Sequence, residues 1–308
     1  MKVAIVGGAG GVGASVAFNL LLGHGEHDIV LVDRRPEMIS SHVWDLEQTL
    51  EQAPGGSIRG GDEDDLLDAG IVVLAAATPP PVNTSRLVYL ADNAAIVAHT
   101  ADLLARADAW TGVLLVVTNP VDPLCTFVHR RTGIDRRRIV GYTLNDSLRL
   151  RTGVAQVLGV RPGSVDAWAV GEHGDTSVLL FDRITVAGDA VELDAEQRAA
   201  VEEYVRTWYA RHVALDSGRS STWTSGLGIA RMVGEIADPA GEMWPASVVL
   251  SGVYGIDGVA VSVPVSLGPR GVEQIHEWEI DSDDLAALRA SAALVRELTD
   301  GIEVPAAT

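Results

Sequence analysis

The sequence predicts an α/β protein with a doubly wound parallel sheet, followed by an α+β domain. In the first half, short and continuously apolar runs alternate with helical patterns, as expected of parallel strands that are covered on both faces. After about Gly141 the pattern changes to short strands and long helices, with no low-complexity linker between the halves. We therefore expect two directly packed units, residues 1–142 and 143–308.

The elements of the first half follow from the order of these runs. An apolar run, residues 3–6, precedes a glycine-dense turn and a helix over residues 14–22 that stops at Gly23. A second β-type run covers residues 29–32. Further predicted strands cover residues 71–77, 113–118 and 138–142, with a helix over 87–107.

The second half begins with a predicted helix over residues 146–158. Short strands are expected within 165–170 and 178–186, and long helices over 194–216 and 222–236. A β-rich run covers residues 247–267, and a final helix begins near Ser282, where two aspartates suit its first turn.

Composition limits the classes of partner. The 308 residues carry a formal net charge of −19, which argues against nucleic acid or an anionic membrane surface. No apolar run has the length of a membrane span, and no signal peptide is predicted. The single cysteine, Cys125, excludes an intramolecular disulfide and fits a cytoplasmic location.

The glycine-dense turn indicates a dinucleotide site and hence a Rossmann-type first domain. Gly8, Gly10 and Gly13 have the spacing G-x-G-x-x-G, and Gly7 adds the alternative reading G-x-x-G-x-x-G. Such a turn needs positive φ and close approach of backbone to a pyrophosphate, which the following helix N-terminus attracts. The predicted cofactor-binding residues of this turn are Gly7, Gly8, Gly10, Gly11, Val12 and Gly13.

An acidic residue supports this interpretation. Asp33 ends the second strand, twenty residues after Gly13, where a carboxylate reaches the ribose hydroxyls of NAD. Arg34 and Arg35 follow and offer a partner for a 2′-phosphate, but Asp33 would repel that phosphate. We therefore expect NAD as the cofactor in preference to NADP.

Four further segments carry polar residues that a core does not need. They are 119–122 (NPVD), 145–149 (NDSLR), 171–175 (GEHGD) and Arg86 after a proline-rich loop. Taken singly, each has an ordinary structural explanation as a helix cap, a surface charge or a turn residue. Together with the glycine turn and Asp33, they resemble the L-lactate/malate dehydrogenase family over essentially the whole chain.

This resemblance implies a role for each polar residue. His173 is the expected acid/base and Asp146 its carboxylate partner, while Arg149 is expected to hold the substrate carboxylate in a bidentate fork. Arg86 is expected to polarise the carbonyl from a mobile loop. Asn119 is expected to position nicotinamide and substrate, and Ser221, with Thr222 as the alternative, to lie near both.

One segment departs from the family pattern. The resemblance places the reader of the substrate side chain six residues before the loop arginine, where malate enzymes have arginine and lactate enzymes usually glutamine. Here the residue is Pro80, and residues 78–85 contain no Arg, Lys or Gln. The resemblance thus implies an NAD-dependent L-2-hydroxy-acid dehydrogenase for a substrate with a neutral side chain, lactate-like or bulkier.

Three alternatives stay open at this point. Malate is the second candidate substrate, if an arginine from elsewhere, such as Arg219, compensates. A glycosidase-like relative would hold a metal with Cys and His, but Cys125 has no plausible histidine ligand in the sequence pattern, and no metal site is predicted. A non-enzymatic NAD-binding protein would not need His173, Asp146 and Arg149 together. The resemblance also implies a homo-oligomer, a dimer or tetramer.

Overall fold

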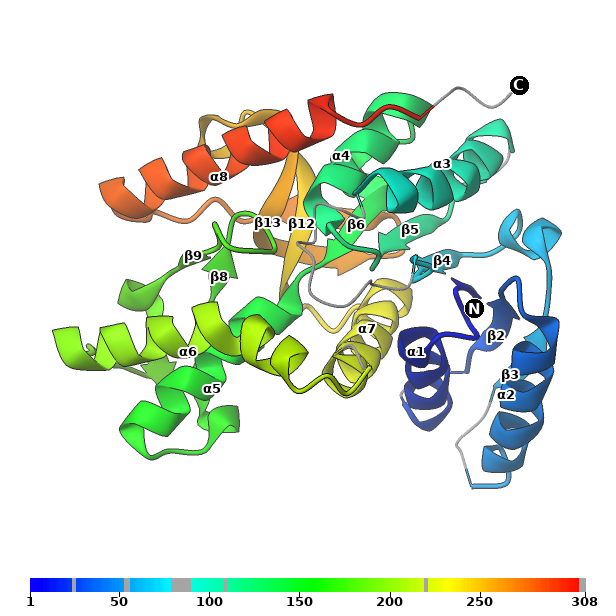
Figure 1. Ribbon diagram of the computed structural model, residues 1–308, viewed down its shortest axis with the longest axis horizontal. Helices are drawn as coiled ribbons and strands as arrows, with labels where there is room; N and C mark the ends of the chain where they lie inside the picture. Colours follow the sequence, from blue (N-terminus) through cyan, green and yellow to red (C-terminus); the bar gives the residue numbers. More distant parts are fainter. Residues whose placement is uncertain (24–25, 53–55, 79–89, 108–109, 219–220, 305–308) are drawn as a thin grey trace.

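A computed structural model describes residues 1–23, 26–52, 56–78, 90–107, 110–218 and 221–304. Its main feature is a nine-stranded sheet in the order β14-β13-β12-β6-β5-β4-β1-β2-β3 (Figure 1). Six neighbouring strands are parallel: β1 (Lys2–Val6), β2 (Asp28–Val32), β3 (Ser57–Gly60), β4 (Ile71–Leu74), β5 (Val113–Val116) and β6 (Ile139–Tyr142). The strand order reverses between β1 and β4, and such a reversal opens a crevice beyond the carboxyl ends of the strands.

Alternate residues of the parallel strands enter two separate cores. Val3 and Ile5 of β1 belong to one hydrophobic cluster, whereas Ala4 between them belongs to the other. Both faces are therefore covered, which confirms the doubly wound prediction. The helices of this half are α1 (Gly11–Leu22), α2 (Pro36–Thr49), α3 (Leu90–Arg106) and α4 (Val121–Thr132).

The second half extends the same sheet. Three antiparallel strands, β12 (Met243–Ser251), β13 (Asp257–Gly268) and β14 (Gly271–Ile275), join it through pairing of β12 with β6. Its helices are α5 (Leu144–Leu158), α6 (Ala195–Ala214), α7 (Thr222–Ala237) and α8 (Ser282–Asp300). The sheet thus crosses residue 142, and the division into units 1–142 and 143–308 stays a prediction.

Several predicted elements differ from the structure in detail. The strand expected within 165–170 is split into β7 (Val165–Asp166) and β8 (Ala169–Val170), which pair in different small sheets. The run 178–186 likewise separates into β9 (Val178–Leu179) and β10 (Thr185–Val186), and β10 pairs with β11 (Asp189–Ala190). The alternation of apolar and polar residues in a short run does not show at which residue the chain changes from one partner strand to another.

Helix beginnings also differ. α1 begins at Gly11 and α5 at Leu144, three and two residues earlier than expected. The Ala14 N–H already bonds the Gly10 carbonyl, and the Asp146 N–H bonds that of Thr143. α2 and β3 were not predicted, and residues 87–89 of the expected helix lie outside the described residues. Within the described part of the chain, no helix combines the length and apolarity needed to cross a membrane.

Candidate active site

The glycine turn has the close backbone approaches that its sequence predicts. Gly7 has φ +90°, and a Cβ there would lie 2.5 Å from the backbone nitrogen of Ala76. A Cβ on Gly13 would lie 2.4 Å from the carbonyl oxygen of Gly7. Larger residues would therefore displace backbone atoms at both positions. Gly10 caps α1, so the first amides of this helix are presented to the crevice by backbone alone, which suits a pyrophosphate.

Asp33 lies directly after β2, beside this turn. Its Oδ2 accepts a hydrogen bond from the backbone N–H of Ala9 at 3.3 Å, and its Oδ1 accepts from the backbone N–H and the Nε of Arg35, both at 3.2 Å. The carboxylate is thus fixed at the edge of the turn with its side chain 12% exposed. This position fits a carboxylate that receives ribose hydroxyls.

The centre of the site is a buried cluster of Asp146, His173 and Arg149. Asp146 lies in the first turn of α5, and His173 follows β8, whose end is held by pairing of Gly171 with Ser262 of β13. Asp146 Oδ2 lies 2.5 Å from His173 Nδ1, and Asp146 Oδ1 accepts a hydrogen bond of 3.0 Å from Arg149 Nη1. One carboxylate therefore orients both the predicted acid/base and the predicted carboxylate receptor.

Arg149 has a second partner that the sequence does not indicate. Its guanidinium carbon lies 4.2 Å from the centroid of the Trp208 ring of α6, and Trp208 in turn stacks on His212 at 5.1 Å. A planar guanidinium between a carboxylate and an aromatic face has few accessible rotamers. Helical periodicity places Trp208 on a face of α6 but does not identify its partner, so no sequence signal points to this contact.

Asn119 lies just beyond β5, on the crevice side of the sheet. The backbone carbonyl of Asn119 accepts a hydrogen bond of 2.7 Å from Asn93 Nδ2. Asn93 Oδ1 accepts one of 2.8 Å from the backbone N–H of Thr78. Asn93 is 4% exposed and connects the chain segments that leave β4 and β5. Sequence reasoning missed it, although a polar residue at a buried position of α3 is a usable signal.

Ser221 precedes α7 as its N-cap and is half-buried. A Cβ on Gly11 would lie 3.4 Å from the Thr222 hydroxyl, which places the start of α7 against the glycine turn. The structure thus brings Ser221 and Thr222 to the dinucleotide crevice. It does not distinguish between the two as the residue that the family pattern implies.

A chain of hydrogen-bonded polar side chains that was not predicted lies next to the buried cluster. The Tyr142 hydroxyl donates to Asn145 Oδ1 at 3.1 Å, and Asn145 Nδ2 donates to the Ser225 hydroxyl at 2.9 Å. All three residues are buried, and burial raises the pKa of Tyr142 above its ordinary value. Since these side chains are hydrogen-bonded to one another, they connect β6, α5 and α7 around Asp146.

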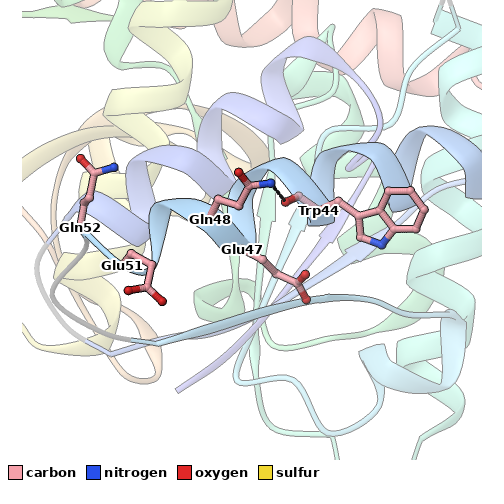
Figure 2. A pocket seen from close by; sticks show the side chains of 5 residues that line it. All are labelled: Trp44, Glu47, Gln48, Glu51 and Gln52. Carbon is pink, nitrogen blue, oxygen red and sulfur yellow. Dashed lines mark hydrogen bonds between the residues drawn. The ribbon is translucent and has the colours of Figure 1, made fainter.

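Arg86, Pro80 and Arg219 lie outside the described residues. A surface hollow that the structure does describe runs along α2, where Trp44, Glu47, Gln48, Glu51 and Gln52 line it (Figure 2). None of these residues belongs to the predicted site. The predicted site residues that the structure describes lie instead at the crevice between the strand ends and α5.

Comparison with known proteins agrees with this geometry. Residues 1–141 match the family model described as lactate/malate dehydrogenase, NAD binding domain, and residues 143–305 match the model described as lactate/malate dehydrogenase, alpha/beta C-terminal domain. A malate dehydrogenase of Halobacterium salinarum is 33% identical over 294 residues, covering 94% of this chain and 96% of that protein. An L-lactate dehydrogenase of Thermus aquaticus is 33% identical over 307 residues, covering 96% and 97%.

Solved structures show the same relationship. A minor L-lactate dehydrogenase from Enterococcus mundtii superposes with a TM-score of 0.89 at 26% identity, covering 99% of both chains. A lactate dehydrogenase from a deep-sea metagenome library superposes with a TM-score of 0.87 at 27% identity, covering 97% of this chain and 98% of that one. The chain belongs to the lactate/malate dehydrogenase family, NAD-dependent oxidoreductases that act on small hydroxy acids.

Proposed function

We propose that this protein is an L-2-hydroxy-acid dehydrogenase that reduces a 2-keto acid with a neutral side chain. The observation that supports it most directly is the buried cluster in which Asp146 contacts both His173 and Arg149. A proton donor and a carboxylate receptor held by one anion are what reduction of a keto acid needs. Neither a structural role nor simple NAD binding requires that pairing.

In this proposal, His173 donates its proton to the substrate carbonyl oxygen. NADH, when bound, supplies the hydride that the carbonyl carbon accepts. With Nδ1 engaged by Asp146, Nε2 is the nitrogen that transfers the proton, and Asp146 stabilises the imidazolium before transfer. Arg149 grips the substrate carboxylate, and Arg86 polarises the carbonyl as oxyanion character develops.

The remaining site residues would bind and orient. Gly7, Gly8, Gly10, Gly11, Val12 and Gly13 would receive the pyrophosphate, and Asp33 the adenosine ribose. Asn119 and Ser221 would border the nicotinamide and the substrate. The position of Ser221 at the amino end of α7, next to the glycine turn, supports this part of the proposal.

Preference for a neutral side chain follows from the loop sequence. A second carboxylate in a closed site needs a cationic partner, and residues 78–85 contain neither arginine nor lysine, with Pro80 at the expected position. Malate is the second candidate substrate, because a malate dehydrogenase is as similar to this chain as a lactate dehydrogenase is. Arg219 would then be the compensating residue to test.

NADH oxidation with a panel of keto acids tests the reaction class. The panel contains pyruvate, oxaloacetate, 2-ketoisocaproate and phenylpyruvate, each with purified protein and a His173→Asn control. We expect turnover with at least one member and none above background in the control. Equal turnover in the control, or none with any keto acid in either protein, would reject the proposal.

We also propose a cytoplasmic homo-oligomer. Helix α1 packs against both α7 and α2, so the three helices adjoin one another. Large apolar side chains on these helices are 41–70% exposed: Phe18, Leu22, Met38, Trp44, Trp223 and Leu227. Figure 2 shows Trp44 at one end of its row on α2. An apolar surface shared by neighbouring helices favours a second copy as its partner. Light scattering on the purified protein measures the assembly.

A further inference from the structure

We propose that Asp122, at the amino end of α4, is a positioning residue that fixes the backbone of His173 and sustains the charge of its imidazolium. This inference rests on the proposed role of His173 as the acid/base. It adds a second carboxyl group that contacts His173, at the backbone N–H and not at the ring.

The contact that carries the inference is short and buried. Asp122 Oδ2 accepts a hydrogen bond from the backbone N–H of His173 at 2.6 Å, and Asp122 is 1% exposed. Asp146 holds the imidazole ring through Nδ1 at 2.5 Å. His173 is thus attached at its backbone and at its ring to two carboxyl groups from different helices, α4 and α5. This double attachment restricts the position of the proton donor.

The position of Asp122 in the chain also joins two parts of the site. It lies three residues after Asn119, in the first turn of α4, whereas His173 comes from the loop after β8. The 2.6 Å hydrogen bond therefore connects the segment proposed to border the nicotinamide with the segment that carries the acid/base.

Few other polar groups lie close enough to the Asp122 carboxyl group to compete with the His173 N–H. The Ser247 hydroxyl of β12 lies beside the carboxyl group and lowers its pKa, while Asp122 Oδ1 completes no full hydrogen bond within the described residues. Cys125 lies one turn along the same helix and is fully buried. Burying a carboxyl group that has only one strong polar contact lowers the stability of the fold, which points to a role beyond packing.

Burial and the neighbouring groups determine the pH at which Asp122 becomes charged. Burial raises its pKa to about 7, against the opposing effects of Ser247, the His173 backbone N–H and the His173 charge, while Glu172 raises it further. Below this pKa the group is neutral, and above it the group is an anion next to His173. The anion attracts the positive charge of a protonated His173 ring, so it favours the proton donor for reduction while Asp122 is ionised.

Asp122→Asn isolates this charge, because the amide oxygen still accepts the His173 N–H while the anion is lost. We expect the alkaline limb of kcat/KM for keto-acid reduction to move to lower pH by at least about half a unit. The rising limb for hydroxy-acid oxidation moves in the same direction, because the neutral imidazole forms earlier. Asp122→Ala removes the acceptor as well as the charge, so there we also expect kcat to fall about tenfold or more through misplacement of the donor.

Glu235→Gln is the matched control. Glu235 of α7 is 5% exposed and accepts backbone N–H bonds from Gly241 and Glu242 at 2.9 and 3.0 Å, but it does not contact His173. It is expected to change Tm without moving either pH limb. If Asp122→Asn also changes only Tm, Asp122 is a structural residue and the inference fails.

Ser247→Ala keeps the inference testable if Asp122→Asn does not fold. Loss of the hydroxyl raises the Asp122 pKa, so both limbs shift to lower pH by less than in Asp122→Asn. An unchanged profile in Ser247→Ala would overturn the inference. The proposed function fails separately, through substantial activity in His173→Asn, whatever the Asp122 variants do.

Discussion

The dinucleotide turn and the catalytic cluster are assembled in different ways. The turn and Asp33 lie within one contiguous β1–α1–β2 unit, and their fit depends on what glycine lacks: a Cβ at Gly13 would reach within 2.4 Å of Gly7. The buried cluster of Asp146, His173 and Arg149 is instead held by contacts between segments: Asp122 and Asp146, from two different helices, bond His173 at 2.6 and 2.5 Å.

This difference separates two kinds of function within one site. In the proposed function the turn binds through backbone and shape, so we expect its variants to change cofactor affinity or selectivity. The cluster is proposed to act through charge and proton position, so we expect its variants to change kcat, substrate KM and pH dependence while cofactor binding stays intact. The following predictions test that separation.

The largest effect is expected for His173→Asn. An amide cannot donate the proton that the imidazolium supplies, so kcat should fall by about 10²–10⁴-fold or more. The dissociation constant for NADH, measured by fluorescence titration, should stay within about twofold because His173 lies outside the turn. Asp146→Asn should also be severe, since the imidazolium loses its buried partner. A comparable loss of NADH affinity in either variant would contradict the expected separation between cofactor binding and proton transfer.

Arg149→Lys is expected to act on substrate binding. Lysine retains the charge but not the planar fork, and it cannot stack on Trp208 in the same way. The keto-acid KM should rise about 10²-fold, as expected when a charge-assisted hydrogen bond worth about 1.5–3 kcal/mol is lost. Steady-state kinetics measure this, and a KM within a few-fold of the parent value would place the carboxylate elsewhere.

Asp33→Ser tests the dinucleotide side. Removal of the carboxylate relieves repulsion of a 2′-phosphate and frees Arg35 from its 3.2 Å contact. The ratio of kcat/KM for NADH over NADPH should decrease by about 10–100-fold. The keto-acid preference should not change. Better use of NADPH by the unmodified protein would show that Arg34 and Arg35 outweigh Asp33.

The smallest expected effect belongs to Trp208→Leu. Leucine keeps apolar contact but loses the ring face over the Arg149 guanidinium, a contact worth about 0.5–2 kcal/mol. Substrate KM should therefore rise by about two- to thirtyfold, with little change in NADH affinity. A matched Trp278→Leu variant, which loses the ring face 4.4 Å from the Arg183 guanidinium carbon, should leave KM unchanged.

The same contrast decides how much was predictable from the sequence. The turn, Asp33 and the pairing of Asp146 with His173 follow from local spacing and family resemblance. The contacts of Arg149 with Trp208 and of Asp122 with His173 do not, because they join residues 59 and 51 positions apart that no motif links. The antiparallel extension of the sheet through pairing of β12 with β6 was also missed, because an apolar run in the sequence does not show which strand it pairs with.

The most direct test of the account compares a neutral keto acid with oxaloacetate. Residues 78–85 contain no arginine or lysine to pair with a second substrate carboxylate. Leaving that carboxylate unpaired in a closed site costs several kcal/mol, so the best neutral substrate should exceed oxaloacetate in kcat/KM by about 10²-fold or more. Pro80→Arg should raise the relative activity with oxaloacetate. A clear preference of the unmodified protein for oxaloacetate would contradict the account and direct the search to Arg219.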